Sequence, residues 1–160
     1  ISPWTTSSLM YCTDCHNNNQ GPGAGGGGPK GPHGSVYAPL LERELVLTDF
    51  AVESSASYAL CYKCHSRNSI LNDESFPSHK LHVVDQKTAC TTCHDSHGVA
   101  GKSRLINFNT TYATPSSNGR LEFLSTGTLR GNCSVSCHGK DHNALEYAPG
   151  TLRAIPTLKR

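Results

Sequence analysis

Only short stretches of this chain alternate hydrophobic and polar residues in a regular way. The segments 104–110 (RLINFNT) and 120–126 (RLEFLST) show this alternation, which predicts short strands. Asn118-Gly119 precedes the second segment, and a Ser-Thr-Gly-Thr turn follows it. We therefore expect a small β-hairpin region in the C-terminal half and no fold based on a sheet.

Helical patterns are equally short. The segment 55–66 (SASYALCYKCHS) predicts a helix, whereas 38–50 fits either a short helix or an extended segment. Residues 17–32 are rich in glycine and proline without any periodicity, so they predict a loop. No apolar run approaches the ~20 residues of a membrane span. These patterns predict one domain, residues 1–160, of mostly irregular coil and short helices.

The composition predicts a thin hydrophobic core. Of the 160 residues only 36% are hydrophobic and 7% aromatic, and the mean hydropathy is −0.42. Such a chain has little apolar surface to bury. Lys and Arg total 14 against 12 acidic residues, and no basic patch stands out, so nucleic-acid binding has little support.

The candidate chemistry lies in four cysteine–histidine motifs. Three are Cys-x-x-Cys-His, and the fourth has one extra residue between its cysteines. On a helical turn, the two thiols can form thioether bonds to the vinyl groups of one porphyrin while the adjacent imidazole faces the iron. The motif cysteines are Cys12, Cys15, Cys61, Cys64, Cys90, Cys93, Cys133 and Cys137, and the expected proximal ligands are His16, His65, His94 and His138.

Paired cysteines at this spacing also occur in zinc ribbons and in disulfide frameworks. Neither of these explains a histidine after every second cysteine, so the favoured interpretation is four c-type haems. The porphyrins would then form much of the core, and loss of haem should mean loss of the fold. Their propionates would make the assembled protein more acidic than its formal net charge of +2.

Further histidines could ligate the distal faces of the irons: His33, His79, His82, His97 and His142. His97 is tethered to the same porphyrin face as His94, so it must serve another haem or none. His79 and His82 are three residues apart and would be close neighbours on a helical turn, so they should serve two different haems.

These distal candidates outnumber the irons, so no iron need be left open. His142 is four residues from His138 and is poorly placed for that haem, and Met10 is a weaker candidate. With imidazole on both axial positions, haem iron is low-spin, cannot bind substrate and has a lower potential than His/Met iron. We therefore expect a protein that carries electrons and is not an enzyme.

The chain contains two pseudo-repeats, residues 11–66 and 89–139. Each has a cysteine–histidine motif, then a His-Gly pair, then a second cysteine–histidine motif. Each copy is expected to hold a haem pair with a His-Gly ligand between, namely His33-Gly34 and His97-Gly98. His16 and His33 are 17 residues apart, whereas His94 and His97 are 3 apart, so the first copy carries a 14-residue insertion. That insertion is the glycine-rich loop.

With its doubled motifs, the run CTTCHDSHG (90–98) and the element FPSHKLHV (76–83), the chain resembles multihaem c-type cytochromes. The resemblance implies covalent haem at all four sites, bis-histidine ligation and a chain wrapped around four stacked haems. The element FPSHKLHV is similar to the Phe-x-x-His-x-x-His of small tetrahaem cytochromes from sulfate reducers. This similarity implies that His79 is the distal ligand of the His94 haem and that His82 serves a different one.

Size, haem number and the segments GPHGS and CHGKDH most resemble the tetrahaem subunits of extracellular cytochrome filaments. We expect electron transfer in a head-to-tail filament, with other copies of the chain and redox proteins or extracellular acceptors as partners. One haem would take its distal ligand from the next subunit, with His33 and His142 as the expected donors.

Two alternatives stay open: a soluble periplasmic shuttle, and a multihaem reductase with one open haem. The surplus of histidines and the absence of a motif with lysine in place of the proximal histidine argue against the reductase. Because haem is attached outside the cytoplasm, we expect an exported, extracellular protein, with Ile1 as the mature terminus after signal-peptide removal.

Overall fold

The computed structural model describes residues 1–5 and 7–149, which form very short elements joined by long coils. The helical elements are α1 (Cys12–Cys15), η1 (Pro22–Ala24), α2 (Ala59–Tyr62), α3 (Arg67–Leu71), the π-helical turn η2 (Leu81–Asp85), α4 (Cys90–Cys93) and η3 (Ser103–Leu105). The strands are β1 (Ala113–Thr114), β2 (Glu122–Gly127), β3 (Arg130–Cys137) and β4 (Lys140–Tyr147). Residues 6 and 150–160, which the single-domain prediction included, lie outside the described residues.

The strands form one antiparallel sheet in which β3 is central. The strands β2 and β1 pair with successive parts of β3, and β4 pairs with it from Gly131 to Cys137. The expectation of a small hairpin region was therefore too narrow. In Cys133-Ser-Val-Ser-Cys137, serine alternates with cysteine or valine. Such alternation is typical of a strand, because successive side chains of a strand lie on opposite faces. The fourth cysteine motif thus lies in the sheet.

The other segments also differ in part from the predictions. The predicted helix 55–66 is limited to α2, and 38–50 forms neither a helix nor a strand. The predicted strand 104–110 does not form, because its backbone pairs with the third motif. Ile106 makes an isolated bridge with His94, and Leu41 makes the same bridge with His16 in the first motif.

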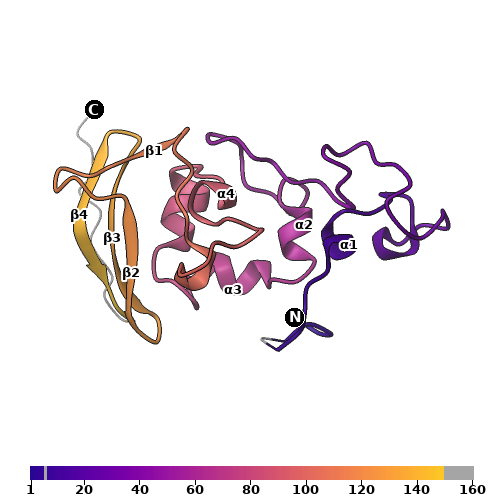
Figure 1. Cartoon of the computed structure of the whole chain (residues 1–160), viewed down its shortest axis with the longest axis horizontal. Helices are drawn as coiled ribbons and strands as arrows, with labels where there is room; N and C mark the ends of the chain where they lie inside the picture. The colour runs from indigo at the N-terminus through magenta and orange to yellow at the C-terminus, as the bar shows by residue number, and fades with distance from the viewer. Residues whose placement is uncertain (6, 150–160) are drawn as a thin grey trace.

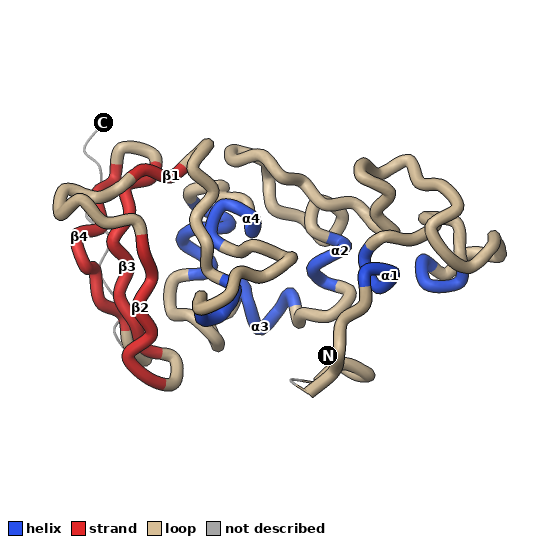
Figure 2. The backbone as a smooth tube through the Cα atoms, viewed as in Figure 1, coloured by secondary structure: helices blue, strands red, loops and turns tan. Residues whose placement is uncertain are grey.

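The labelled helices and the sheet are spread along the long axis of the molecule (Figure 1). The sheet forms one end, α4, α3 and α2 follow, and α1 lies towards the other end with the indigo glycine-rich segment beyond it. Extended coils join these elements (Figure 2). The four cysteine motifs, on α1, on and after α2, on α4 and on β3, therefore succeed one another along the molecule.

The described residues bury few large hydrophobic side chains. The buried ones are Leu41, Tyr58, Leu60, Val83, Phe123 and Val135, with Ala89 and Ala113. In contrast, Leu9, Val36, Phe50 and Val52 are each more than 65% exposed, at 77%, 78%, 66% and 69%. The polypeptide thus presents apolar surface that a large flat cofactor could cover. None of the described helices has the length and apolar character needed to cross a bilayer.

Candidate functional site

The three regular motifs share one local geometry. In each, the histidine N–H donates to the carbonyl of the first cysteine, at 2.8 Å for His16, 3.0 Å for His65 and 2.9 Å for His94. The two cysteines of a motif are therefore held on one helical turn. At His16 and His94 the backbone then becomes extended, with φ of −90° and −103°, which ends the helix at the imidazole.

The imidazoles of the first and third motifs are anchored through Nδ1. His16 Nδ1 lies 3.0 Å from the carbonyl oxygen of Pro39, and His94 Nδ1 lies 3.1 Å from that of Arg104. A carbonyl only accepts hydrogen bonds, so Nδ1 carries the proton and the lone pair is on Nε2. Metal-bound histidines are commonly fixed by this kind of hydrogen bond.

Six histidines lie in three ring pairs. The pairs and their centroid distances are His16 with His97 at 6.2 Å, His94 with His79 at 6.5 Å, and His82 with His142 at 6.1 Å. A metal between two imidazoles would have each Nε2 at about 2.0 Å and each ring centroid about 1.1 Å further, hence centroids about 6 Å apart. The spacing of all three pairs fits one metal ion held between two opposed imidazoles.

The hydrogen bonds and burial at the distal candidates are also compatible with such a role. His82 Nδ1 lies 2.7 Å from the carbonyl oxygen of Ser78, which again leaves Nε2 as the ligating nitrogen. Burial and, to a smaller extent, neighbouring His94 together lower the pKa of His79 to about 4. Burial also lowers the pKa of His94. Both imidazoles are therefore neutral at pH 7, the form that binds a metal.

The pairing differs from the expected one in two places. His79 lies beside His94, as the resemblance implied, and ligation of one iron by this pair stays a prediction. His97 was expected to lie between the two haems of the second pseudo-repeat. Its ring instead pairs with that of His16, which belongs to the first pseudo-repeat. His142 faces His82, a combination that spacing along the chain did not indicate.

The fourth motif has a different environment. His138, the expected proximal ligand, has a positive φ of 48°, and its Nε2 lies 2.6 Å from Oδ2 of Asp49. The Asp49 side chain is fully buried, and its Oδ1 accepts hydrogen bonds from the Ala89 N–H at 2.7 Å and from the Thr92 hydroxyl. The ring nitrogen that would ligate iron is thus bound to a carboxylate that also contacts α4.

A second buried acid joins the first two motifs. The Glu42 side chain is 1% exposed, and its Oε1 lies 2.9 Å from Nζ of Lys63, which is inside the second motif. The same Nζ donates to the carbonyl of Asp14 in the first motif at 2.6 Å. Sequence reasoning missed both Glu42 and Asp49, because each is a single acid in an irregular segment with no motif around it.

The thiols of successive motifs are neighbours. Burial and, to a smaller extent, Cys137 and Cys133 of the fourth motif together raise the pKa of Cys93 to about 12. A hydrogen bond between Cys61 and Cys90 joins the second and third motifs, raising the pKa of Cys90 and lowering that of Cys61. Cofactors attached at successive motifs would therefore lie close together.

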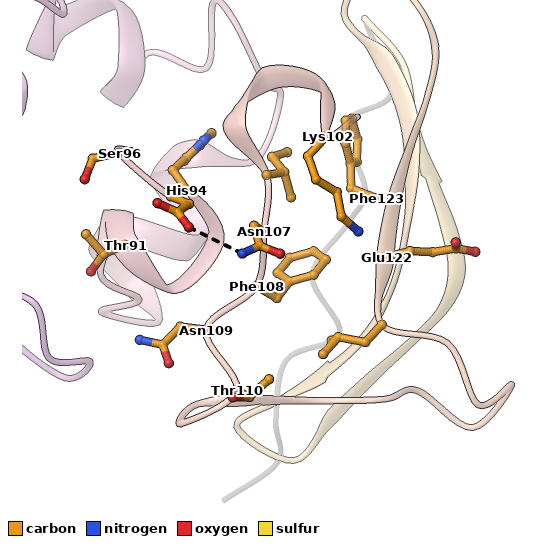
Figure 3. A pocket seen from close by; sticks show the side chains of 13 residues that line it. Thr91, His94, Ser96, Lys102, Asn107, Phe108, Asn109, Thr110, Glu122 and Phe123 are labelled. Atoms are coloured by element: carbon orange, nitrogen blue, oxygen red, sulfur yellow. Dashed lines mark hydrogen bonds between the residues drawn. The ribbon is translucent and has the colours of Figure 1, made fainter. Parts of the chain in front are cut away.

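A cavity of about 480 Å³ lies beside the third motif. His94, Asn107 and Phe108 lie on one side of it, and Glu122 and Phe123 of β2 on the other (Figure 3). No motif cysteine lines this space. It adjoins His94, one of the paired imidazoles.

The cysteines and the remaining candidate ligands were also located in the described part of the chain. All eight cysteines are free of disulfide bonds there. Across residues 1–5 and 7–149, no group of three or more His, Cys, Asp or Glu side chains is placed to hold a metal ion alone, as a zinc ribbon requires. His33 and His65 are exposed and belong to none of the three ring pairs, and Met10 is 53% exposed.

The chain was compared with family models, curated proteins and solved structures, and no match was found in any of them.

Proposed function

We propose that this protein carries electrons along four covalently attached c-type haems whose irons have two histidine ligands each. The arrangement of histidines carries the proposal: three imidazole pairs have the spacing of axial ligands, and the thiols of successive motifs are neighbours. A bis-histidine haem iron exchanges one electron and offers no open position to a substrate. The protein is thus a carrier, with no bond chemistry of its own.

The chain's own residues would attach and orient each cofactor. Each thiol adds across one vinyl double bond, sulfur bonding to the inner carbon and hydrogen to the outer one, so nothing leaves. Burial raises the pKa of most of these thiols, among them Cys15, Cys64 and Cys133, which favours their protonated form. Pro39 and Arg104 carbonyls would hold the axial imidazoles of His16 and His94 in orientation.

Intact mass spectrometry of the protein, produced in a host that attaches haem, tests the proposal. The expected mass is that of the 17.2 kDa chain plus four haems. A mass showing no haem would refute the proposal, and so would iodoacetamide labelling of several cysteines in the purified native protein.

We also propose that copies of the chain assemble head to tail into an extracellular filament. His33, His65 and His138 lie outside the three ring pairs, and His138 contacts Asp49. The haem at Cys61 and Cys64 therefore lacks a distal histidine among the described pairs. His33 is exposed and directly follows the glycine-rich loop 17–32, which lies at one end of the molecule (Figure 1). A heterologous contact of this kind builds an open chain of subunits rather than a closed ring.

Negative-stain microscopy and light scattering of wild-type protein and of His33→Ala test the assembly. We expect filaments for wild type, and shorter particles with one carbon-monoxide-binding haem per chain for His33→Ala. Lys30→Ala, in the same loop, is the matched control and should polymerise. A wild-type protein that stays monomeric with four low-spin haems would be the soluble shuttle instead.

A further inference from the structure

The first motif of each pseudo-repeat is held by the same backbone arrangement. His16 makes an isolated bridge with Leu41, and His94 makes the equivalent bridge with Ile106. The Nδ1 atom of each histidine contacts the carbonyl oxygen that lies two residues before the bridging residue, at 3.0 and 3.1 Å. Positions in the two halves can therefore be matched one to one, counted from Leu41 and Ile106.

Glu42 and Asn107 occupy the same place in this arrangement. Each directly follows the bridging residue and donates its backbone N–H to the second cysteine of the motif, Cys15 at 2.8 Å and Cys93 at 3.0 Å. The side chains differ, because the first half has a carboxylate where the second half has a neutral amide. The two halves therefore differ in charge at this position.

The glycine-rich loop buries the Glu42 carboxylate. The Glu42 side chain is 1% exposed, and a Cβ atom at Gly23 would overlap its carboxylate, so η1 packs this closely only because Gly23 has no side chain. Arg43, the next residue, donates to the Gly23 carbonyl at 2.9 Å and holds the loop in place. The glycine-rich insertion thus excludes water from the carboxylate.

Lys63 supplies the opposite charge. Its Nζ lies 2.9 Å from Oε1 of Glu42 and donates to the Asp14 carbonyl at 2.6 Å. The Lys63 side chain is itself only 16% exposed. Lys63 lies between the cysteines of the second motif, and Asp14 lies between those of the first. The ion pair is therefore placed between the attachment sites of two cofactors.

Charges in this place change the energy of an added electron. Reduction of a haem adds one negative charge, which a nearby carboxylate opposes and a nearby ammonium group favours. Salt and water screen such effects strongly at the surface and much less at buried positions. Because Glu42 and Lys63 are both largely buried beside the first two motifs, each charge should act on the haems attached there.

We propose that Glu42 and Lys63 set the reduction potentials of the haems attached at the first two motifs, Glu42 lowering them and Lys63 raising them. Neither residue ligates iron, and both act through their charge. This inference rests on the proposed haem function and goes beyond it, because it names the groups that determine how readily the first two haems accept an electron. The second half has the neutral Asn107 at the position of Glu42.

Spectroelectrochemical titration of the holoprotein tests the proposal, with four haems in each variant confirmed by mass. Glu42→Gln should move part of the titration curve to higher potential, and Lys63→Gln should move part of it to lower potential. Arg43 Nε lies 3.5 Å from Glu42 Oε1, so the carboxylate keeps a cationic neighbour in Lys63→Gln. Glu146→Gln removes a charge from an exposed position on β4 and should leave the curve unchanged.

The double variant separates an effect of charge from an effect of packing. Glu42→Gln combined with Lys63→Gln removes both charges, so its curve should return towards that of wild type, whereas two packing defects would add. Single variants that leave the curve unchanged, or that shift it in the same direction, would overturn the proposal. Where Glu42→Gln does not accumulate, the direction of the Lys63→Gln shift decides. A wild-type protein without haem would instead refute the proposed function itself.

Discussion

At the scale of single residues, the chemistry depends on which ring nitrogen each histidine leaves free. Carbonyl oxygens of Pro39, Ser78 and Arg104 bind the Nδ1 atoms of His16, His82 and His94. These contacts fix the tautomer and leave Nε2 for a metal. At His138 the contact, to a carboxylate oxygen of Asp49, is made by Nε2 itself.

Replacing His97 should open one haem. His97 faces His16 at 6.2 Å, so His97→Ala should remove the distal ligand of the haem at Cys12 and Cys15. We expect four attached haems, with one high-spin iron that binds carbon monoxide when reduced. Ser96→Ala, which changes the adjacent exposed residue, should bind none. A His97→Ala protein without a carbon monoxide site would contradict the His16–His97 pairing.

At the scale of elements, short helices are held by side chains from neighbouring coils. Glu53 accepts a hydrogen bond from the Tyr62 hydroxyl of α2 at 2.9 Å and two from the Arg67 guanidinium of α3, at 2.8 and 2.6 Å. Helices of four or five residues are not stable alone. This carboxylate therefore helps to fix the segment that carries the second motif.

Glu53→Gln should lower the free energy of unfolding of the holoprotein by about 1 kcal/mol, since Arg67 is 39% exposed and part of the ion-pair energy is screened. Guanidinium denaturation followed by circular dichroism measures the effect. Glu74→Gln, at an exposed position, is the control and should be neutral. Equal stability of the two variants would show that the Glu53 contacts contribute nothing.

The same carboxylate makes stability depend on pH. The hydrogen bond from Arg67 holds the pKa of Glu53 below its usual value of 4.5. The folded state therefore binds this proton more weakly than the unfolded state, so the contribution is complete above pH 4.5 and is lost as the pH falls through the lowered pKa. The stability difference between wild type and Glu53→Gln should shrink on going from pH 7 to acidic pH. A difference that stays constant or grows would be the contrary result.

At the scale of the whole molecule, the polypeptide has little core of its own. The buried large side chains are few and spread along an elongated chain, and several others are exposed. With the proposed haems bound, such a fold would depend on them in the way that small metal-binding domains depend on their metal.

Protein made without haem attachment should therefore fail to fold. Substituting all eight cysteines by serine should give the circular dichroism spectrum of a largely unfolded chain and rapid proteolysis. The haem-loaded wild type, treated in the same way, should be resistant. A cooperative thermal transition in the eight-serine protein would show that the polypeptide folds without its cofactors.

The sequence alone was enough to predict the helical turns at the regular motifs, the strand 120–126 and the irregular character of the remainder. These features are local: cysteine spacing, alternation and glycine content act over a few residues. The spacing of His79 and His82 predicted that they serve two different haems, which stays a prediction. The structure places their rings beside those of His94 and His142.

The tertiary structure decided the features that join distant segments. His16 and His97 pair although the glycine-rich loop lies between them in the sequence. Asp49 contacts His138, which is 89 residues away in the sequence. Whether a histidine binds a metal or a carboxylate depends on what is packed against its Nε2, which no local pattern contains. For the same reason the extra residue between Cys133 and Cys137 looked like a spacer variant, and only strand pairing put His142 on the face of both cysteines.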